Sequence, residues 1–131
     1  MERCADLEQL VADWFRASSS ADPSVIDAHV SLDADTRLIA GPGGWIQGGS
    51  EVAAYLRGEL EAGGGRSTTT LTDTEAYRHG DVGWAATRIT VALPDGRELH
   101  PRWSTVFVRE DGTWKVVQMH ASFARDAQAA S

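Results

Sequence analysis

The chain has 131 residues, of which 42% are hydrophobic and 24% charged, and its formal net charge is -7. This length and composition predict a single globular domain with its own core and exclude a disordered chain. The acidic balance argues against nucleic acid and anionic membranes as partners, and no apolar run approaches the roughly 20 residues that a membrane span needs.

The one cysteine, Cys4, cannot form a disulfide within the chain, which is typical of proteins in a reducing compartment. The segment MERCADLEQL has no basic stretch followed by an apolar one, as a secretory signal would. We therefore expect a cytoplasmic protein.

Apolar residues at helical spacing predict an amphipathic helix over residues 2–18. Asp22 and Pro23 follow a serine run and predict the N-cap and first turn of a short second helix. The first quarter of the chain is therefore expected to be helical.

Two short strands are predicted next, at residues 36–40 and 45–47, with a glycine-rich turn between them. Ser50 then predicts the N-cap of a third helix, which Gly63 and the two glycines after it should end.

The second half of the chain has strand-like patterns, with Asp-Gly pairs that favour hairpin turns. Strands are predicted at residues 67–78, 82–93, 98–108 and 114–123. Helices grouped before strands predict an α+β domain of the order α-α-β-β-α-β-β-β-β over residues 1–124, followed by a flexible tail at residues 125–131.

Three-residue loops are expected at both late hairpins, Pro94-Asp95-Gly96 and Glu110-Asp111-Gly112. Alternation along the strands then places Arg88 opposite Arg102, Ala86 opposite Ser104, Ser104 opposite Gln118, and Arg102 opposite His120. One face of the sheet should carry a polar cluster that consists of Arg88, His100, Arg102, Ser104, Gln118 and His120. At one end of that face, the same pairing places the apolar residues Val106, Val108, Trp114 and Val116.

The opposite face carries large apolar side chains, among them Trp103, Phe107 and Met119. Exposed apolar patches of that size mark interfaces, so we expect a homodimer with this face in the interface.

Two segments resemble a known superfamily: GPGGWIQGGSEVAAYL, and RWSTVFVREDGTWKVVQMHASF with its Arg-x-Ser, Asp-Gly-x-Trp-Lys and His-x-Ser patterns. Together with the order of the elements they resemble the SnoaL-like superfamily, which includes ketosteroid isomerases and polyketide cyclases. The resemblance implies a cystatin-like, curved antiparallel sheet wrapped around three helices as a cone, and a dimer. The acids of the ketosteroid isomerases are missing, because Gly41 and Thr105 or Val106 stand at their positions.

Two arginines side by side in a partly dry cavity repel each other unless an anion lies between them. For Arg88 and Arg102 that anion is either a ligand carboxylate or phosphate, or an internal acid such as Asp33, Asp35 or Asp73. The sequence leaves both open.

His120 is the candidate for proton transfer, since an imidazole titrates near neutrality, although a buried structural histidine is the alternative. Tyr55 is a candidate donor to an oxyanion, and Trp14, Trp45 and Trp84 are candidate walls of a pocket. The histidines and the cysteine lack zinc spacing, so no metal and no cofactor are expected.

The first hypothesis is a SnoaL-like domain that binds a small, anionic and partly apolar molecule through Arg88 and Arg102, with the three tryptophans, Ser104, Gln118 and His100 around it. One alternative is a cofactor-independent lyase, isomerase or cyclase that uses His120 for proton transfer. For this alternative the resemblance implies a dehydratase-like set of His100, His120, Tyr55 and Asp35. The other is a dimerisation module without catalysis.

Overall fold

A computed structural model describes residues 1–41, 43–63 and 67–123 of the chain. The tail predicted at residues 125–131 lies outside the described residues. The helices are α1 (Ala5–Ser19), α2 (Ser24–His29) and α3 (Gly49–Gly63). The strands are β1 (Glu2–Arg3), β2 (Arg37–Ala40), β3 (Gly44–Gln47), β4 (Thr68–His79), β5 (Val82–Ala92), β6 (Glu98–Leu99), β7 (Pro101–Glu110) and β8 (Thr113–Phe123).

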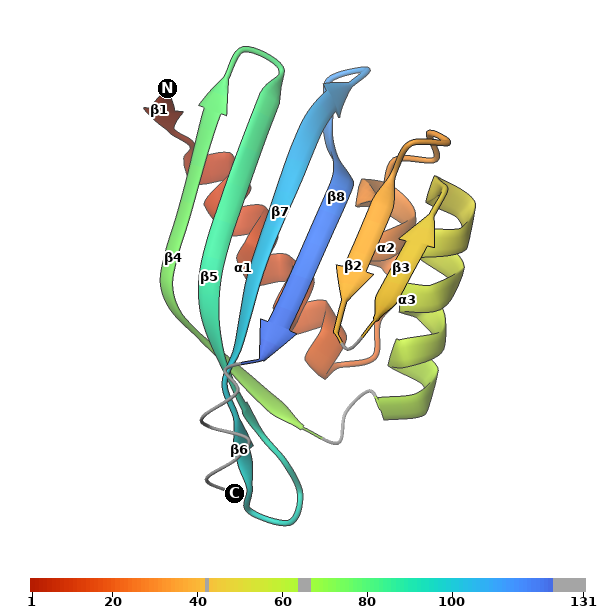
Figure 1. The fold of residues 1–131 in the computed structure, drawn as a ribbon. Helices are drawn as coiled ribbons and strands as arrows, with labels where there is room; N and C mark the ends of the chain where they lie inside the picture. The colour runs from red at the N-terminus through yellow and green to blue at the C-terminus, as the bar shows by residue number, and fades with distance from the viewer. Residues whose placement is uncertain (42, 64–66, 124–131) are drawn as a thin grey trace.

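The strands form one curved sheet in the order β1-β4-β5-β7-β8-β2-β3, and β6 extends the sheet by pairing with β5 (Figure 1). The predicted α+β order is confirmed, with β1 as an added strand and the predicted strand at 98–108 divided into β6 and β7. Neighbouring strands are antiparallel except β2 and β8, which run parallel, so the sheet is mixed.

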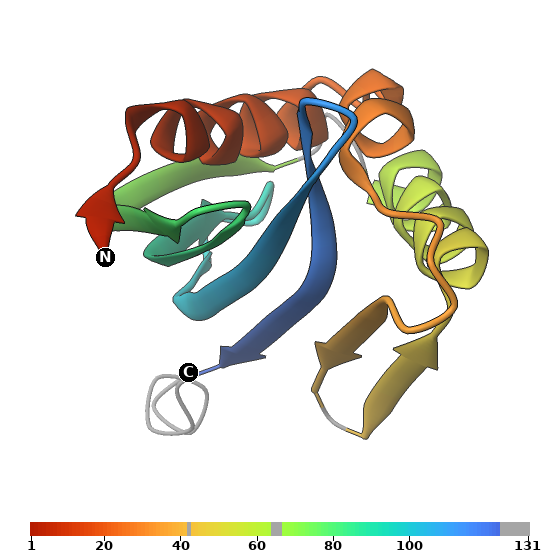
Figure 2. The ribbon, with the colours of Figure 1, turned by 90° about the horizontal axis from the view of Figure 1, so that it is seen from above.

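The helices lie within the curve of this sheet, with α1 across the long strands and α3 beside β2 and β3 (Figure 2). The face toward the helices, here called the inner face, holds a row of directly paired residues that are each at most 4% exposed. This row runs from β4 to β2 through Ala76, Ala85, Thr105, Met119 and Leu38.

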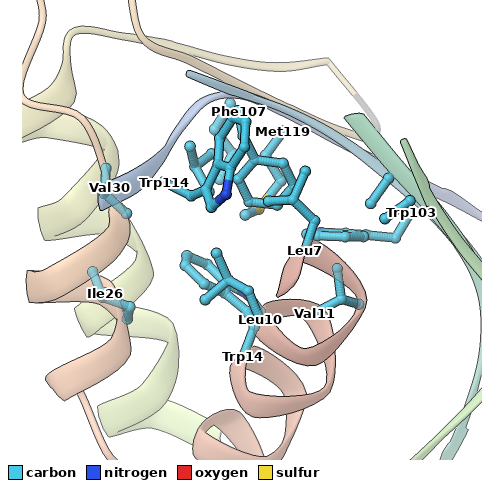
Figure 3. Close-up of a cluster of buried hydrophobic side chains, with 14 of the residues drawn as sticks. Leu7, Leu10, Val11, Trp14, Ile26, Val30, Trp103, Phe107, Trp114 and Met119 are labelled. Carbon is cyan, nitrogen blue, oxygen red and sulfur yellow. The ribbon is translucent and has the colours of Figure 1, made fainter. Parts of the chain in front are cut away.

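The core lies between α1 and this inner face (Figure 3). Leu7, Leu10, Val11 and Trp14 fall on one side of α1, as the helical spacing predicts, and are all buried. They pack against side chains of the long strands, in particular Trp103, Phe107, Trp114, Val116 and Met119. Burial of apolar area of this kind is the main driving force for the fold.

The predicted helix starts are close to the observed ones. Helix α2 begins at Ser24 with Pro23 at its N-cap, so the prediction of Asp22 as N-cap is one residue too early. The Asp22 carboxylate still accepts a hydrogen bond from the Ser24 backbone N–H at 3.0 Å. Helix α3 begins one residue before Ser50, at Gly49, where a Cβ would lie 2.1 Å from the Ser31 carbonyl oxygen. Only glycine fits at this close approach of the backbone.

The two late hairpins turn differently. Leu93 and Arg97 are joined by a backbone hydrogen bond of 2.8 Å, which confirms the three-residue loop between them. In the last hairpin Glu110 pairs with Thr113, so the loop has two residues, Asp111 and Gly112, and the predicted three-residue loop is wrong. Both loop residues have positive φ, as such a turn requires.

A β-bulge follows in β8. The pairing shifts between Val106 and Phe107, because β8 carries an extra residue there. Beyond the bulge Ser104 pairs with His120 and Val106 with Gln118. The predicted partners were Gln118 for Ser104 and His120 for Arg102, so the register is off by two residues but the faces are unchanged.

Within the described residues, no helix is long and apolar enough to span a bilayer.

Candidate functional site

The predicted polar cluster shares one face of the sheet. Arg88 pairs directly with Arg102, and Ala86 with Ser104, as the sequence predicts. Ser104 pairs with His120 on β8, and Gln118, two residues before His120, lies on the same face. All these side chains therefore lie on the face opposite the core, here called the outer face.

The location of this cluster corrects the prediction. Arg88, Arg102, Ser104, Gln118 and His120 are exposed and not inside the cone. Burying charged guanidinium groups without partners costs far more than leaving them in water, whereas burying apolar rings is favourable. The sheet accordingly turns its arginines outward.

The predicted dimer face is corrected for the same reason. Trp103, Phe107 and Met119 are 6%, 1% and 4% exposed and belong to the core under α1. Trp114 and Val116, predicted on the polar face, are buried with them, because the two-residue loop reverses the faces before the bulge. A contact between two copies cannot use these side chains.

The arginine pair has one carboxylate beside it. The guanidinium of Arg88 lies 3.6 Å from a carboxylate oxygen of Asp73, and both side chains are largely exposed. Of the three acids predicted as internal partners, Asp73 is the one that is observed. Asp33 instead accepts a hydrogen bond from the Asp35 backbone N–H at 2.8 Å.

His100 lies beside the arginine pair, where one ring nitrogen is 3.4 Å from the Thr90 hydroxyl. His120 lies further along the outer face, between Ser104 and Ile39 on the neighbouring strands. His29 is the last residue of α2, and its ring contacts the Trp114 carbonyl oxygen at 2.9 Å.

Tyr55 lies on α3 and is 41% exposed. Its hydroxyl hydrogen-bonds the Glu59 carboxylate one turn along the helix, which raises the pKa of Tyr55 above its ordinary value. Since His120 is on the outer face of the sheet, the structure does not bring these two candidate catalytic groups together.

The three tryptophans predicted as pocket walls are in three places. Trp14 is buried on α1 and points into the core (Figure 3). Trp84 is on the outer face, where its ring packs against Tyr77 with centroids 4.9 Å apart. Trp45 is 63% exposed on β3, with the Arg37 guanidinium 5.9 Å from its ring.

One cleft lies among the helices, and sequence reasoning missed it apart from Trp14. Its volume is about 260 Å³, and its walls come from the C-terminal ends of α1 and α3 and from α2. The described residues around it are Trp14, Ser18, Ile26, Leu56, Glu59, Leu60, Gly63 and Ser67. The sequence signal was the apolar spacing of Leu56 and Leu60 on the third helix, which is equally typical of a filled core.

We call this hollow the helix cleft. Its apolar walls suit a ring or a short aliphatic chain, and Glu59 is the one charged side chain among its described walls. The Ser18 hydroxyl donates to the Trp14 carbonyl oxygen at 3.1 Å, so this hydroxyl is already engaged. The cleft and the arginine pair lie on opposite sides of the sheet, and the described walls of the cleft include neither arginine.

Among the described residues, no group of three or more histidine, cysteine or acidic side chains is arranged to hold a metal ion.

Known proteins of the same shape are numerous. An NTF2-like protein from Pseudomonas putida KT2440 superposes with a TM-score of 0.78 at 20% identity, covering 95% of this chain and 89% of that one. A candidate ketosteroid isomerase from Shewanella frigidimarina NCIMB 400 gives 0.75 at 16% identity, with coverages of 87% and 92%. A candidate dehydratase of the NTF2-like family from Streptomyces avermitilis gives 0.75 at 17% identity, with coverages of 91% and 94%.

At these sequence identities the similarity shows the fold alone. Two other similar structures, from Caulobacter vibrioides and Nostoc punctiforme, are described as having a cystatin-like fold. No curated protein matches the sequence significantly. The SnoaL-like domain family, in contrast, matches residues 7–126, which is nearly the whole chain. The predicted resemblance is thereby confirmed, and the chain belongs to the SnoaL-like domain family.

Proposed function

We propose that this SnoaL-like domain binds a small, largely apolar molecule in the helix cleft. The observation that carries the proposal is the cleft itself, walled by Trp14, Ile26, Leu56 and Leu60 at the ends of three helices. Ligand sites are concave, mostly apolar and furnished with a few polar groups. The helix cleft has that composition.

The chemistry of the walls narrows the ligand class. A volume of about 260 Å³ is below that of pockets for drug-sized ligands, so the ligand is about the size of one or two rings. The Glu59 carboxylate at the edge accepts hydrogen bonds and repels anions. The cleft therefore favours a neutral ring that carries one hydrogen-bond donor, in contrast to the anionic ligand that the sequence suggested for a pocket within the cone.

Binding, rather than a defined reaction, is what this site supports. Isomerase and dehydratase are descriptions of structural neighbours at 16% and 17% identity. In this chain the candidate proton-transfer residue, His120, lies outside the cleft on the outer face. Glu59 is the one charged side chain among the described walls of the helix cleft, so a reaction there by acid–base chemistry would have to use its carboxylate.

The test is a ligand-induced shift of the unfolding temperature, with 4-methylphenol and indole as neutral probes and benzoate as the charged comparison. A ligand at a hundred times its Kd adds about 2.7 kcal/mol to the free energy of unfolding. We expect the neutral probes, but not benzoate, to stabilise the wild type through the helix cleft. Leu60→Trp, which fills the cleft, should abolish that stabilisation.

The matched control is Glu61→Trp, which adds the same ring at the next, exposed position of α3. This variant should respond to the neutral probes as the wild type does. Equal stabilisation of Leu60→Trp and Glu61→Trp would place the binding elsewhere and overturn the proposal. Circular dichroism of both variants verifies that α3 remains folded.

A second candidate function is assembly into a homodimer through the outer face. Its apolar side chains favour this, since Trp45 and Val82 are 63% and 50% exposed, and Val106 and Val108 are half-buried nearby. Exposed apolar surface of this kind is typical of interfaces. The proposed face is opposite to the one that the sequence suggested.

Sedimentation equilibrium tests this assembly. We expect a dimer for the wild type and a monomer for the double variant Trp45→Ser, Val82→Ser. Tyr55→Ser removes an exposed aromatic ring from α3 and should leave the dimer intact. A monomeric wild type at about 100 μM, a concentration far above the Kd of a stable dimer, would exclude the homodimer.

A further inference from the structure

The directly opposed arginines of the outer face present an unusual balance of charge. Arg88 and Arg102 occupy paired positions on β5 and β7, where like charges destabilise a sheet. Arg88 has one long contact to Asp73, at 3.6 Å. In the part of the chain that the structure describes, Arg102 forms no ion pair. Of the two opposed guanidinium groups, only that of Arg88 thus has a carboxylate partner among the described residues.

The surface around this pair is hollowed. One depression, of about 590 Å³, includes both arginines and the irregular part of β4. Another, of about 440 Å³, includes both arginines and the base of the β5–β6 hairpin. We call the two together the arginine groove; besides the arginines, its walls are Arg3, Thr72, Asp73, Thr74, Glu75, Ala86, Thr87, Ile89, Thr90, His100 and Pro101.

The two parts of the groove differ in chemistry. Arg3, Asp73 and Glu75 make the first part charged, but the Arg3 guanidinium is held by Glu8 at 2.6 Å. The described walls of the second part include no acidic side chain, and the carbon atoms of Thr72, Thr90 and the His100 ring give it apolar surface above the buried residues Ile89 and Pro101. A molecule lying along the groove therefore meets free guanidinium donors at its centre and apolar surface toward the hairpin.

We propose that the arginine groove is a second ligand site, which takes a carboxylate or phosphate group attached to a small apolar body. The planar fork of each guanidinium matches an oxyanion with two parallel N–H···O bonds. An oxyanion between Arg88 and Arg102 also removes their mutual repulsion. The apolar body packs against the His100 ring and the carbon atoms of Thr90.

Asp73 is the internal competitor for this oxyanion. Its carboxylate is the acid nearest to Arg88, and it projects from the β-bulge of β4 with a φ of 56°. A bound ligand must displace it. Removing the charge of Asp73 should therefore strengthen binding, a result that a purely structural ion pair would not produce.

Isothermal titration calorimetry with phenylphosphonate, benzoate and neutral benzyl alcohol tests the site. We expect the two anions to bind at the arginine pair, and the tighter anion shows whether phosphate or carboxylate is preferred. Benzyl alcohol suits the helix cleft, so any binding of the alcohol should be unchanged by loss of either arginine. Arg102→Ala and Arg88→Ala should each weaken binding roughly tenfold or more, as expected for the loss of a charged hydrogen-bond donor. Arg102→Lys keeps the charge without the fork and should give an intermediate loss.

Asp73→Asn should tighten binding several-fold. Arg97→Ala and Asp13→Asn are charge-matched controls, because these residues form exposed ion pairs outside the groove with Asp95 and Arg16. Both controls should retain wild-type affinity. Three results would overturn the proposal. They are that neither anion binds, that Arg97→Ala weakens binding as much as Arg102→Ala does, or that Asp73→Asn weakens binding.

The groove and the helix cleft are distinguished in the same experiment. Leu60→Trp should leave the affinity for phenylphosphonate unchanged, and Arg102→Ala should leave the response to 4-methylphenol unchanged. If Leu60→Trp abolishes anion binding, the anions occupy the helix cleft and the arginine groove is not a site.

Discussion

The inner and outer faces of β5 and β7 come from the same strands and yet form two different surfaces. On the inner face Ala85, Thr105 and Phe107 are at most 2% exposed beneath α1. On the outer face their immediate neighbours, Ala86 and Ser104 among them, reach solvent. The face with more apolar area is the one that packs against the helices. The presence of polar side chains suited to ligand binding does not determine which face this is.

The free energies of burial explain why the arginine face points outward. Full burial of a large apolar side chain contributes about 1.5–3 kcal/mol, and the inner face holds Trp103, Phe107 and Met119. Turning the sheet over would expose these three and bury Arg88 and Arg102. An unpaired guanidinium in the core costs several kcal/mol, so the two terms act in the same direction.

The largest effect that the comparison predicts is that of Phe107→Ala. Phe107 is 1% exposed and packs within the core cluster. Truncation of a buried phenylalanine lowers the free energy of unfolding by about 3–5 kcal/mol, through lost burial and the cavity left behind. Urea denaturation followed by circular dichroism measures it.

Val106→Ala, one residue earlier on the outer face, is the comparison for Phe107→Ala. Val106 is half-buried in the single chain, so its truncation should cost less than about 1 kcal/mol. A cost near that of Phe107→Ala would mean that the outer face is as well packed as the core. Such a result, at a concentration where the chain is monomeric, would contradict the contrast between the faces.

Most of the fold follows from the sequence, since local signals place its elements. Apolar spacing predicts α1 and α3 to within a few residues, and Asp-Gly pairs mark both late hairpins. The parallel pairing of β2 with β8 was not predicted, because it joins segments about 80 residues apart. Periodicity within one segment holds no information about such a distant partner.

Register is harder to predict than the strands themselves. Asp95-Gly96 and Asp111-Gly112 are the same dipeptide, yet the first belongs to a three-residue loop and the second is a two-residue loop. The proline before Asp95 occupies a loop position in the first hairpin, whereas Glu110 pairs within the ladder in the second. The bulge in β8 then returns Gln118 and His120 to the predicted face, so two errors in pairing compensate.

The candidate site was predicted less well than the fold. Alternation shows that Arg88, Arg102, Ser104, Gln118 and His120 share a face, and the structure confirms this. Alternation does not say which face lies under the helices. The helix cleft was missed because leucines at helical spacing line a cleft and fill a core with the same pattern.

A smaller effect is expected from adding volume at adjacent positions on the two faces. Ala85→Val places two methyl groups on the inner face, where Ala85 is 0% exposed between Ala76 and Thr105. Overpacking of a filled core costs about 1–3 kcal/mol, since side chains must leave their preferred rotamers. The urea midpoint should fall, with an unchanged slope.

Ala86→Val is the same substitution one residue later, where the side chain points to the outer face and a β-branched residue suits a strand. Its effect should lie within about 0.5 kcal/mol in either direction. Because the two variants have the same composition and lie on the same strand, propensity and net charge cancel between them. The remaining difference in the free energy of unfolding measures packing alone. Equal changes in the two variants would mean that the inner face can accommodate two more methyl groups, in spite of the complete burial of Ala76, Ala85 and Thr105.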